Sequence, residues 1–214
     1  EYFQKFKKQT DKKVSIIIHS SLKDDISNIF PLGVISNTLT INCNENGYYS
    51  SFDSDRYGFN NNDKEWDSEE INFLLLGDSY VQGACVMFED TITGNLKKDL
   101  KKTVLNLGNG GNGPLKSFAA LKEYFPEKRV NNVLFFFSEI NDIKNLNEEI
   151  ENPFMLNYIK NENFKQNLKL KQNEINDILN KKSIKEEIEY LKFKEKNKNI
   201  SIKIYVKNFP IFFF

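Results

Sequence analysis

Residues 71–79, which read INFLLLGDS, decide the fold of this chain. The first six residues are almost all apolar, and the run stops at a glycine. A short apolar run bounded by glycine is typical of a strand that is buried on both faces of a parallel sheet. Two similar runs follow, at residues 104–107 and 133–137, and each ends in a polar or glycine-rich loop. We therefore expect three parallel strands.

Helical patterns separate these strands. Ile92, Leu96 and Leu100 recur at i, i+4 and i+8. Pro114 stands where the next helix can begin, because proline suits the first turn of a helix, and a further helical pattern follows the third strand. Strands that alternate with helices predict right-handed βαβ units. The expected fold class is α/β, a three-layer α/β/α arrangement around a flavodoxin-like parallel sheet, with residues 71–76 in its central strand.

The first part of the chain has a different character. Residues 1–70 are polar and rich in turn-forming residues. Short apolar stretches at residues 14–18 and 39–41 are typical of strands or extended segments. We expect residues 1–70 to form an irregular N-terminal leader that packs on the core.

The α/β/α domain is expected to occupy residues 71–214. It contains a Lys/Asn-rich helical segment at about residues 151–199, followed by a predicted strand at residues 200–206. The chain begins at Glu1 rather than at a methionine and ends in three phenylalanines. We expect it to be cut at both ends and the sheet to be incomplete at the C-terminus.

The composition excludes several classes of protein. The 214 residues include 30 Lys plus Arg and 30 Asp plus Glu, so the formal net charge of zero gives no general attraction to nucleic acid or anionic membranes. No apolar run reaches the roughly 20 residues that a membrane helix needs. The single histidine excludes a multi-histidine zinc site. We expect Cys43 and Cys85 to be reduced and buried, which, with the lack of a signal segment, favours the cytoplasm.

Three loops at one edge of the predicted sheet carry the candidate site. In an open parallel sheet, ligands bind beyond the carboxyl ends of the strands. The first strand ends in Gly77-Asp78-Ser79, the second in residues 106–113 (NLGNGGNG) and the third in residues 138–142 (SEIND). If the first strand is central, these loops meet.

Together these loops can perform acyl chemistry. A serine at a strand-to-helix turn, here Ser79, can act as a nucleophile. Its attack on an ester makes an oxyanion, which needs aimed N–H donors. The backbone N–H groups of Ser79 and Gly111 and the side-chain amide of Asn141 are candidates for these donors. Tyr80 and Gln82 lie close to the serine in the sequence and are candidates to shape an acyl or sugar pocket.

These motifs resemble those of the SGNH hydrolase superfamily, also called GDSL-type esterases. The matching residues are Gly77-Asp78-Ser79 for the first block, residues 106–111 for the second and Asn141-Asp142 for the third. The resemblance covers about residues 71–145. Residues 55–60 (DRYGFN) also look like the leader of bacterial SGNH-like proteins encoded beside surface-polysaccharide genes.

The resemblance implies a function and assigns roles. Ser79 would be the nucleophile, and Gly111 and Asn141 would be oxyanion donors. The family implies no cofactor and no metal. The expected reaction is hydrolysis or transfer of an acyl group, on a carbohydrate-linked or small-molecule ester. Asp78 and Asp142 are expected to support the site, Asp78 by holding its loop through backbone hydrogen bonds.

The general base of the family is missing from this sequence. In the family it is a histidine in a late Asp-x-x-His motif, and the only histidine here is His19, far upstream. We expect the chain to be truncated before that block, so that the base lies outside this sequence; the alternative is a family member that lost its catalysis. A lone histidine after an apolar stretch is expected to be packed or on the surface. A serine without a base is a poor nucleophile at neutral pH. We therefore expect the chain as it stands to be weakly active or inactive.

Two other functions fit the same residues. The first is a non-catalytic binding module on the same fold. The second is a dinucleotide-binding domain, because Gly108, Gly110 and Gly113 match G-x-G-x-x-G between a strand and a helix. The dinucleotide hypothesis does not explain the first and third loops.

Overall fold

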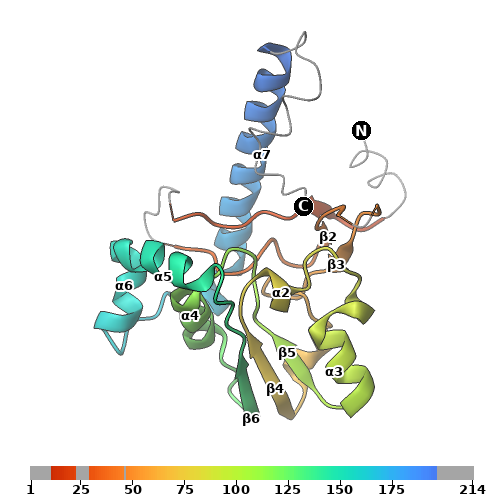
Figure 1. Ribbon diagram of the computed structural model, residues 1–214, viewed down its shortest axis with the longest axis vertical. Helices are drawn as coiled ribbons and strands as arrows, with labels where there is room; N and C mark the ends of the chain where they lie inside the picture. The colour runs from red at the N-terminus through yellow and green to blue at the C-terminus, as the bar shows by residue number, and fades with distance from the viewer. Residues whose placement is uncertain (1–10, 23–28, 46, 197–214) are drawn as a thin grey trace.

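A parallel sheet lies at the centre of the structure, a computed structural model that describes residues 11–22, 29–45 and 47–196 (Figure 1). The strands are β1 (Val14–Ile16), β2 (Leu39–Ile41), β3 (Ser51–Asp53), β4 (Glu70–Leu76), β5 (Val104–Asn106) and β6 (Arg129–Phe135). The α-helices are α2 (Ser79–Gln82), α3 (Ile92–Leu100), α4 (Pro114–Tyr124), α5 (Asp142–Glu151), α6 (Pro153–Lys160) and α7 (Gln172–Lys196). Short 3-10 turns are η1 (Asp63–Asp67), η2 (Phe88–Asp90) and η3 (Leu168–Leu170).

The strand order of this sheet is β5-β4-β6, and both pairs are parallel. Leu75 of β4 lies opposite Asn106 of β5 and Leu134 of β6. The prediction that the run at residues 71–76 is central, with the other two strands on either side, is therefore confirmed. Because all three strands run in one direction, their carboxyl ends open onto the same edge of the sheet.

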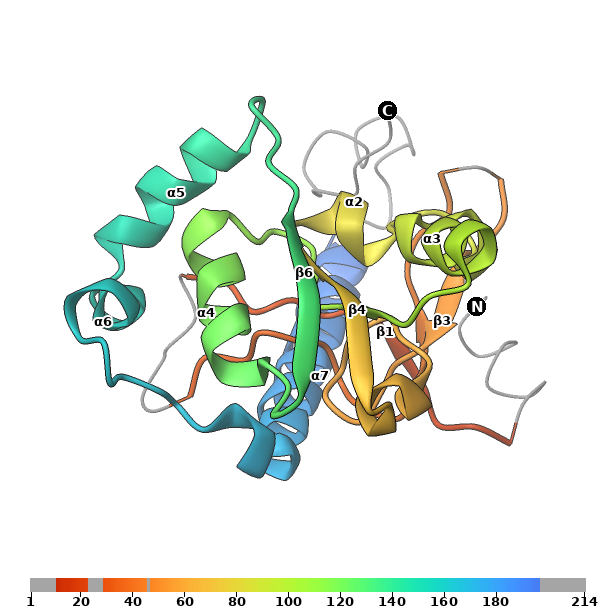
Figure 2. The same ribbon diagram turned by 90° about the horizontal axis from the view of Figure 1, so that it is seen from below.

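Helices cover both faces of the sheet. Leu74 belongs to the main core cluster together with Leu115 of α4. Leu75 points to the opposite face, into a smaller cluster that Ile92 and Leu96 of α3 complete. Figure 2 shows α4 and α3 on opposite sides of the strands. The α/β class and the parallel sheet expected from the sequence are confirmed.

Strand β6 begins earlier than the sequence predicts. The apolar run placed a strand at residues 133–137, whereas β6 spans Arg129–Phe135. Its polar first half pairs with β4 all the same: Asn132 is exposed and lies opposite Phe73. The strand is at the edge of the described sheet, where polar side chains reach solvent, so hydrophobicity alone misplaces its start.

The leader contributes a second sheet and part of the core. Its order is β1-β2-β3, with β1 parallel and β3 antiparallel to β2. The segments expected at residues 14–18 and 39–41 correspond to β1 and β2, whereas β3 was not predicted. Several leader side chains are buried in the same cluster as those of β4, namely Phe30, Leu32, Phe59 and Trp66. The leader and the parallel sheet therefore share one hydrophobic core.

The two cysteines are bonded to each other, which corrects the expectation that both are reduced. A disulfide joins Cys43 of the leader to Cys85, just beyond α2, with the Cα atoms 5.1 Å apart. Their sequence separation of 42 leaves no local signal for this pairing. Disulfides persist in oxidising compartments, so the cysteines no longer favour the cytoplasm.

The Lys/Asn-rich segment is helical, as predicted, and contains α6 and α7. In α7, Ile175 and Leu179 are fully buried, whereas Ile184 and Ile188, further along, are exposed. Figure 1 shows that this second half of α7 stands away from the rest of the molecule. None of the described helices combines the length and the apolar character needed to cross a membrane. The strand predicted at residues 200–206 lies outside the described residues.

Candidate functional site

Ser79 is the first residue of α2, directly after the central strand. Asp78 is the N-cap of this helix, and its Oδ1 accepts a hydrogen bond from the backbone N–H of Tyr80 at 2.9 Å. Asp78 therefore makes a backbone hydrogen bond within the loop. Asp78 is buried and Ser79 is half-buried, so the serine lies at the surface end of the turn.

The loop after β6 reaches the loop after β4. Asn141 Nδ2 donates to Asp78 Oδ2 at 3.3 Å. The other amide atom, Asn141 Oδ1, is buried and has no hydrogen-bond partner in the described part of the chain. A buried amide oxygen without a hydrogen-bond partner lowers the stability of the folded state. This oxygen is therefore available to accept a hydrogen bond from a ligand.

Asp142 shapes the loop that carries Asn141. Its Oδ2 accepts from the backbone N–H of Ser138 at 2.7 Å, and its own N–H donates to the Ser138 carbonyl oxygen at 3.0 Å. Burial raises the pKa of the Asp142 carboxyl; the hydrogen bond from Ser138 opposes the rise and the charge of Asp78 adds to it. The carboxyl therefore closes the turn between β6 and α5.

The loop between β5 and α4, which we call the glycine loop (residues 108–113), donates almost all of its backbone N–H groups to protein acceptors. Native proteins pair nearly all buried backbone donors, so an exception is informative. The N–H groups of Gly108, Asn109 and Gly110 donate to Asn106 Oδ1, Gly77 O and Gln82 Oε1, respectively. Those of Asn112 and Gly113 donate to Asn109 O and Glu149 Oε1.

Gly111 is that exception. Its backbone N–H has no acceptor among the described residues, and the residue is exposed. Its φ is +73°, and no atom lies within 4 Å of the position that a Cβ would take. The backbone N–H of Ser79 also has no acceptor in this part of the chain. Two donors that are unpaired among the described residues therefore lie in the loops that follow the neighbouring strands β4 and β5. An oxyanion hole needs such donors aimed at one point.

Gln82 does not line a substrate pocket as the sequence suggested. It is 1% exposed, and its amide is bonded to the glycine loop. Nε2 donates to Asn109 Oδ1 at 3.0 Å, and Oε1 accepts from the Gly110 N–H at 3.0 Å. Tyr80, by contrast, is 72% exposed and is free to contact a ligand.

A carboxylate from α5 caps α4. Gly113, the N-cap of α4, has no capping side chain, and the buried Glu149 carboxylate accepts from the N–H groups of Gly113 at 2.7 Å and of Leu115 at 2.8 Å. Burial raises the pKa of Glu149, while these bonds and the charge of Lys116 oppose the rise. A dinucleotide pyrophosphate would need this same helix N-terminus. The position of Glu149 therefore disfavours the dinucleotide hypothesis.

His19 lies against the glycine loop. Its Nδ1 is 3.0 Å from Asn109 Oδ1, and since an amide oxygen only accepts, Nδ1 carries the proton. A Cβ on Gly110 would come within 2.6 Å of its Nε2. Burial lowers the pKa of the imidazole to about 4, although the bond to Asn109 opposes this. His19 is a packed residue, and no hydrogen bond joins it to Ser79 in the described part of the chain.

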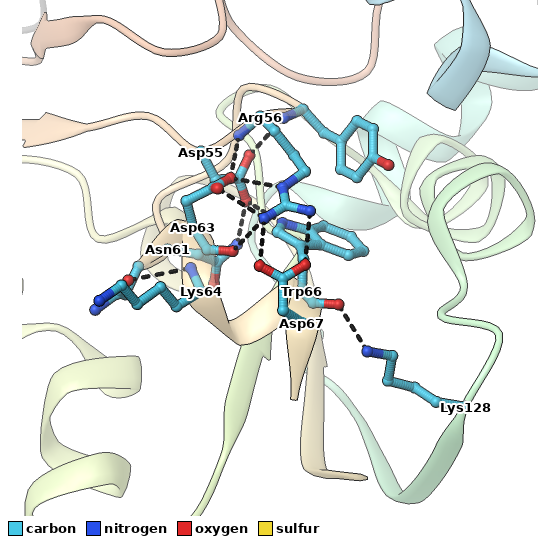
Figure 3. Close-up of polar contacts among 10 residues, drawn as sticks. Asp55, Arg56, Asn61, Asp63, Lys64, Trp66, Asp67 and Lys128 are labelled. Carbon is cyan, nitrogen blue, oxygen red and sulfur yellow. Dashed lines mark hydrogen bonds and ion pairs between the residues drawn. The ribbon is translucent and has the colours of Figure 1, made fainter. Parts of the chain in front are cut away.

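A buried carboxylate, Asp55, organises the leader next to these loops (Figure 3). Its four donors are the backbone N–H groups of Tyr57 and Phe59 and the side chains of Asn61 and Trp66. Burial raises the pKa of the Asp55 carboxyl to about 6, against the effect of these bonds. Asn61 also bonds the backbone N–H and carbonyl of Asn106, at 2.8 and 2.9 Å. The leader therefore holds the end of β5, where the glycine loop begins, a role that the sequence did not indicate.

A groove of about 560 Å³ runs between the leader and the segment that follows α2. Most of its lining comes from β3, residues 60–63 and residues 87–89. Ser79, Gly111 and Asn141 are not among the lining residues. Within the described ranges, no group of three or more His, Cys, Asp or Glu side chains could hold a metal ion.

The comparisons with known proteins identify no relative. No family model, no curated protein and no solved structure matches the chain. Any assignment of function therefore depends on the motifs and on the geometry described above.

Proposed function

We propose that this chain is an SGNH-type serine esterase or acyltransferase domain that acts on a carbohydrate-linked or small-molecule ester. One observation carries the proposal. Of the N–H groups in the glycine loop, only that of Gly111 is left unpaired among the described residues, and Gly111 is the residue that the second motif block assigns to the oxyanion hole. The helices on both faces of a parallel sheet with a central first strand suit the flavodoxin-like arrangement of that class.

In this proposal each loop has one task. Ser79 Oγ attacks the acyl carbonyl carbon, a new C–O bond forms, and the hydroxyl proton passes to a base. The N–H groups of Ser79 and Gly111 stabilise the oxyanion that develops. Asn141 supplies a third donor, because its amide has a second N–H besides the one directed at Asp78. Each such donor is typically worth about 100- to 1,000-fold in kcat.

The base is the part that the described residues do not supply. His19 is held by Asn109, and burial keeps its pKa near 4, so it is neutral but directed at the glycine loop. We expect slow turnover by the chain alone. Free imidazole should accelerate it, because imidazole can accept the proton of Ser79 in place of a side chain.

A catalytically inactive binding module is the second candidate. The observation that favours it is again the position of His19, which leaves Ser79 without a histidine partner in the described part of the chain. The unpaired Oδ1 of Asn141 and the exposed Tyr80 would then contact an acylated glycan without chemistry. Binding of such a ligand should survive Ser79→Ala.

The test is hydrolysis of 4-nitrophenyl acetate by wild type, Ser79→Ala and Ser138→Ala, each with and without imidazole. Ser138 is a matched control, because it is another half-buried serine at the same edge of the sheet. We expect Ser79-dependent turnover that imidazole increases, with Ser138→Ala close to wild type. Equal rates for wild type and Ser79→Ala under both conditions would exclude the esterase. Binding of an acetylated oligosaccharide by Ser79→Ala in that case would favour the binding module.

A further inference from the structure

We propose that Gln82 is a positioning residue that sets the direction of the Gly111 N–H relative to Ser79. This inference rests on the esterase function proposed above and extends it to a residue that no motif block includes. Gln82 is the last residue of α2, the four-residue helix that Ser79 begins. It is therefore tied to the nucleophile by a single helical turn.

The Gln82 side chain joins α2 to the glycine loop through both ends of its amide. Nε2 donates to Asn109 Oδ1 at 3.0 Å, and Oε1 accepts from the Gly110 N–H at 3.0 Å. The residues bonded are the two that directly precede Gly111. Two hydrogen bonds from one planar group fix both the distance and the orientation of the loop, which a single bond would not do.

The other hydrogen bonds of the glycine loop involve atoms that Gln82 does not replace. Asn109 Oδ1 receives its second hydrogen bond from His19 Nδ1 at 3.0 Å. On the far side, Lys116 Nζ donates to the Gly111 carbonyl oxygen at 2.7 Å, and Glu149 holds Gly113. Among the described residues, no atom lies within 4 Å of the Cβ position of Gly111. Lys116 therefore holds the carbonyl side of Gly111, and Gln82 holds the two residues that precede its N–H.

The close approach of the two segments explains why the loop is rich in glycine. A Cβ on Gly108 would lie 2.7 Å from Gln82 N, and a Cβ on Gly110 would lie 3.2 Å from Gln82 Oε1. Both distances are shorter than the usual van der Waals contact of a Cβ atom. The sequence pattern that resembles a dinucleotide motif therefore serves close packing of the loop on α2.

A second buried glutamine provides a matched control. Gln166 is 4% exposed and also uses both ends of its amide, with Oε1 accepting from Phe30 N–H at 2.6 Å and Nε2 donating to the Tyr158 hydroxyl oxygen at 2.6 Å. Its partners Phe30 and Tyr158 belong to the main core, and neither of these hydrogen bonds involves a residue of the three loops. Gln166→Leu should therefore cost stability in the same way as Gln82→Leu but leave Gly111 unchanged.

The experiment compares Gln82→Leu, Gln82→Glu and Gln166→Leu in the intact chain, at a temperature where circular dichroism shows all three folded. We expect Gln82→Leu to lower kcat for a nitrophenyl ester by up to about 100-fold with little change in KM, because a misdirected donor acts on the transition state. Gln82→Glu keeps the acceptor for Gly110. Its activity relative to wild type should rise as the pH falls, because protonation restores a donor towards Asn109.

Amide NMR gives a readout that does not need turnover. Gln82→Leu should abolish the exchange protection of the Gly110 N–H and shift the Gly111 resonance, whereas Gln166→Leu should do neither. If the Gly111 resonance is unchanged in Gln82→Leu, or if both leucine variants lower kcat equally, the positioning role is wrong. Absence of Ser79-dependent turnover in wild type would refute the esterase proposal instead, and the NMR result would still decide whether Gln82 sets Gly111.

Discussion

The side-chain amide of Asn141 lies 3.3 Å from the carboxylate of Asp78, although the two residues are 63 positions apart in the sequence. Asp78 caps the helix that Ser79 begins, and Asn141 is the N-cap of α5. The contact therefore fixes the third loop on the first through the residue next to the serine. The parallel strands bring both loops to one edge of the sheet, so the two side chains come within hydrogen-bond distance.

Removal of the Glu149 carboxylate should destabilise the protein. Glu149→Ala leaves the buried N–H groups of Gly113 and Leu115 without an acceptor, so we expect the free energy of unfolding to fall by about 2–3 kcal/mol in urea titrations. Glu148 is the control, because it is the exposed neighbour on α5. Glu148→Ala should change the free energy by no more than about 0.5 kcal/mol. Equal effects of the two substitutions would contradict the capping role.

Burial of neutral His19 should make stability depend on pH. Its pKa falls from 6.5 to about 4 on folding, so its contribution is fully present above pH 6.5 and is lost as the pH falls through 4. Over that window the free energy of unfolding of wild type should decrease by up to about 3 kcal/mol more than that of His19→Leu. Lys116 and Lys182 are the charged groups that act on the imidazole, and both are unchanged in His19→Leu. Parallel pH profiles for the two proteins would rule this out.

Gly58 should tolerate no side chain. Its φ is +84°, and a Cβ would lie 1.9 Å from the Val34 carbonyl oxygen, so Gly58→Ala should lower the free energy of unfolding by more than about 3 kcal/mol. Gly47 has a similar φ of +80° but nothing within 4 Å of its Cβ position. Gly47→Ala should therefore cost only about 1–2 kcal/mol, the strain of the left-handed backbone alone. Chemical denaturation of both variants separates the clash from the strain.

Loss of the Cys43–Cys85 disulfide should lower stability through the unfolded state. The bond closes a loop across a sequence separation of 42 residues, so Cys43→Ser with Cys85→Ser should reduce the free energy of unfolding by about 2–4 kcal/mol. A reductant should lower the Tm of wild type and leave that of the double variant unchanged. Thiol titration of the native protein should detect no free thiol, and two reactive thiols would show that the bond is absent.

Local patterns in the sequence determine much of the frame. The apolar run at residues 71–76 and the glycine that follows it predicted β4 as the central strand, and the structure confirms this. Pro114 marked the start of α4, the spacing of Ile92, Leu96 and Leu100 predicted α3, and a further helical pattern was expected after the third strand, where α5 lies. These features are readable because a buried strand and an amphipathic helix each impose a short period on the sequence. The three loops at the sheet edge follow directly from that frame.

What only the tertiary structure decides is how buried polar groups pair across long distances in the chain. Hydrogen bonds join Gln82 to Asn109, 27 positions away, and Glu149 to Gly113, 36 positions away. Another joins His19 to Asn109, 90 positions away. The Cys43–Cys85 bond likewise joins residues that are far apart in the sequence. The early start of β6 has a different cause, because its first residues are mostly polar and exposed at the edge of the sheet. The hydrogen-bonded residues do not recur at a fixed spacing in the sequence, because a polar side chain is buried wherever the fold supplies a hydrogen-bond partner. The partner is defined by the packed fold, and for that reason the free N–H of Gly111 could be found only there.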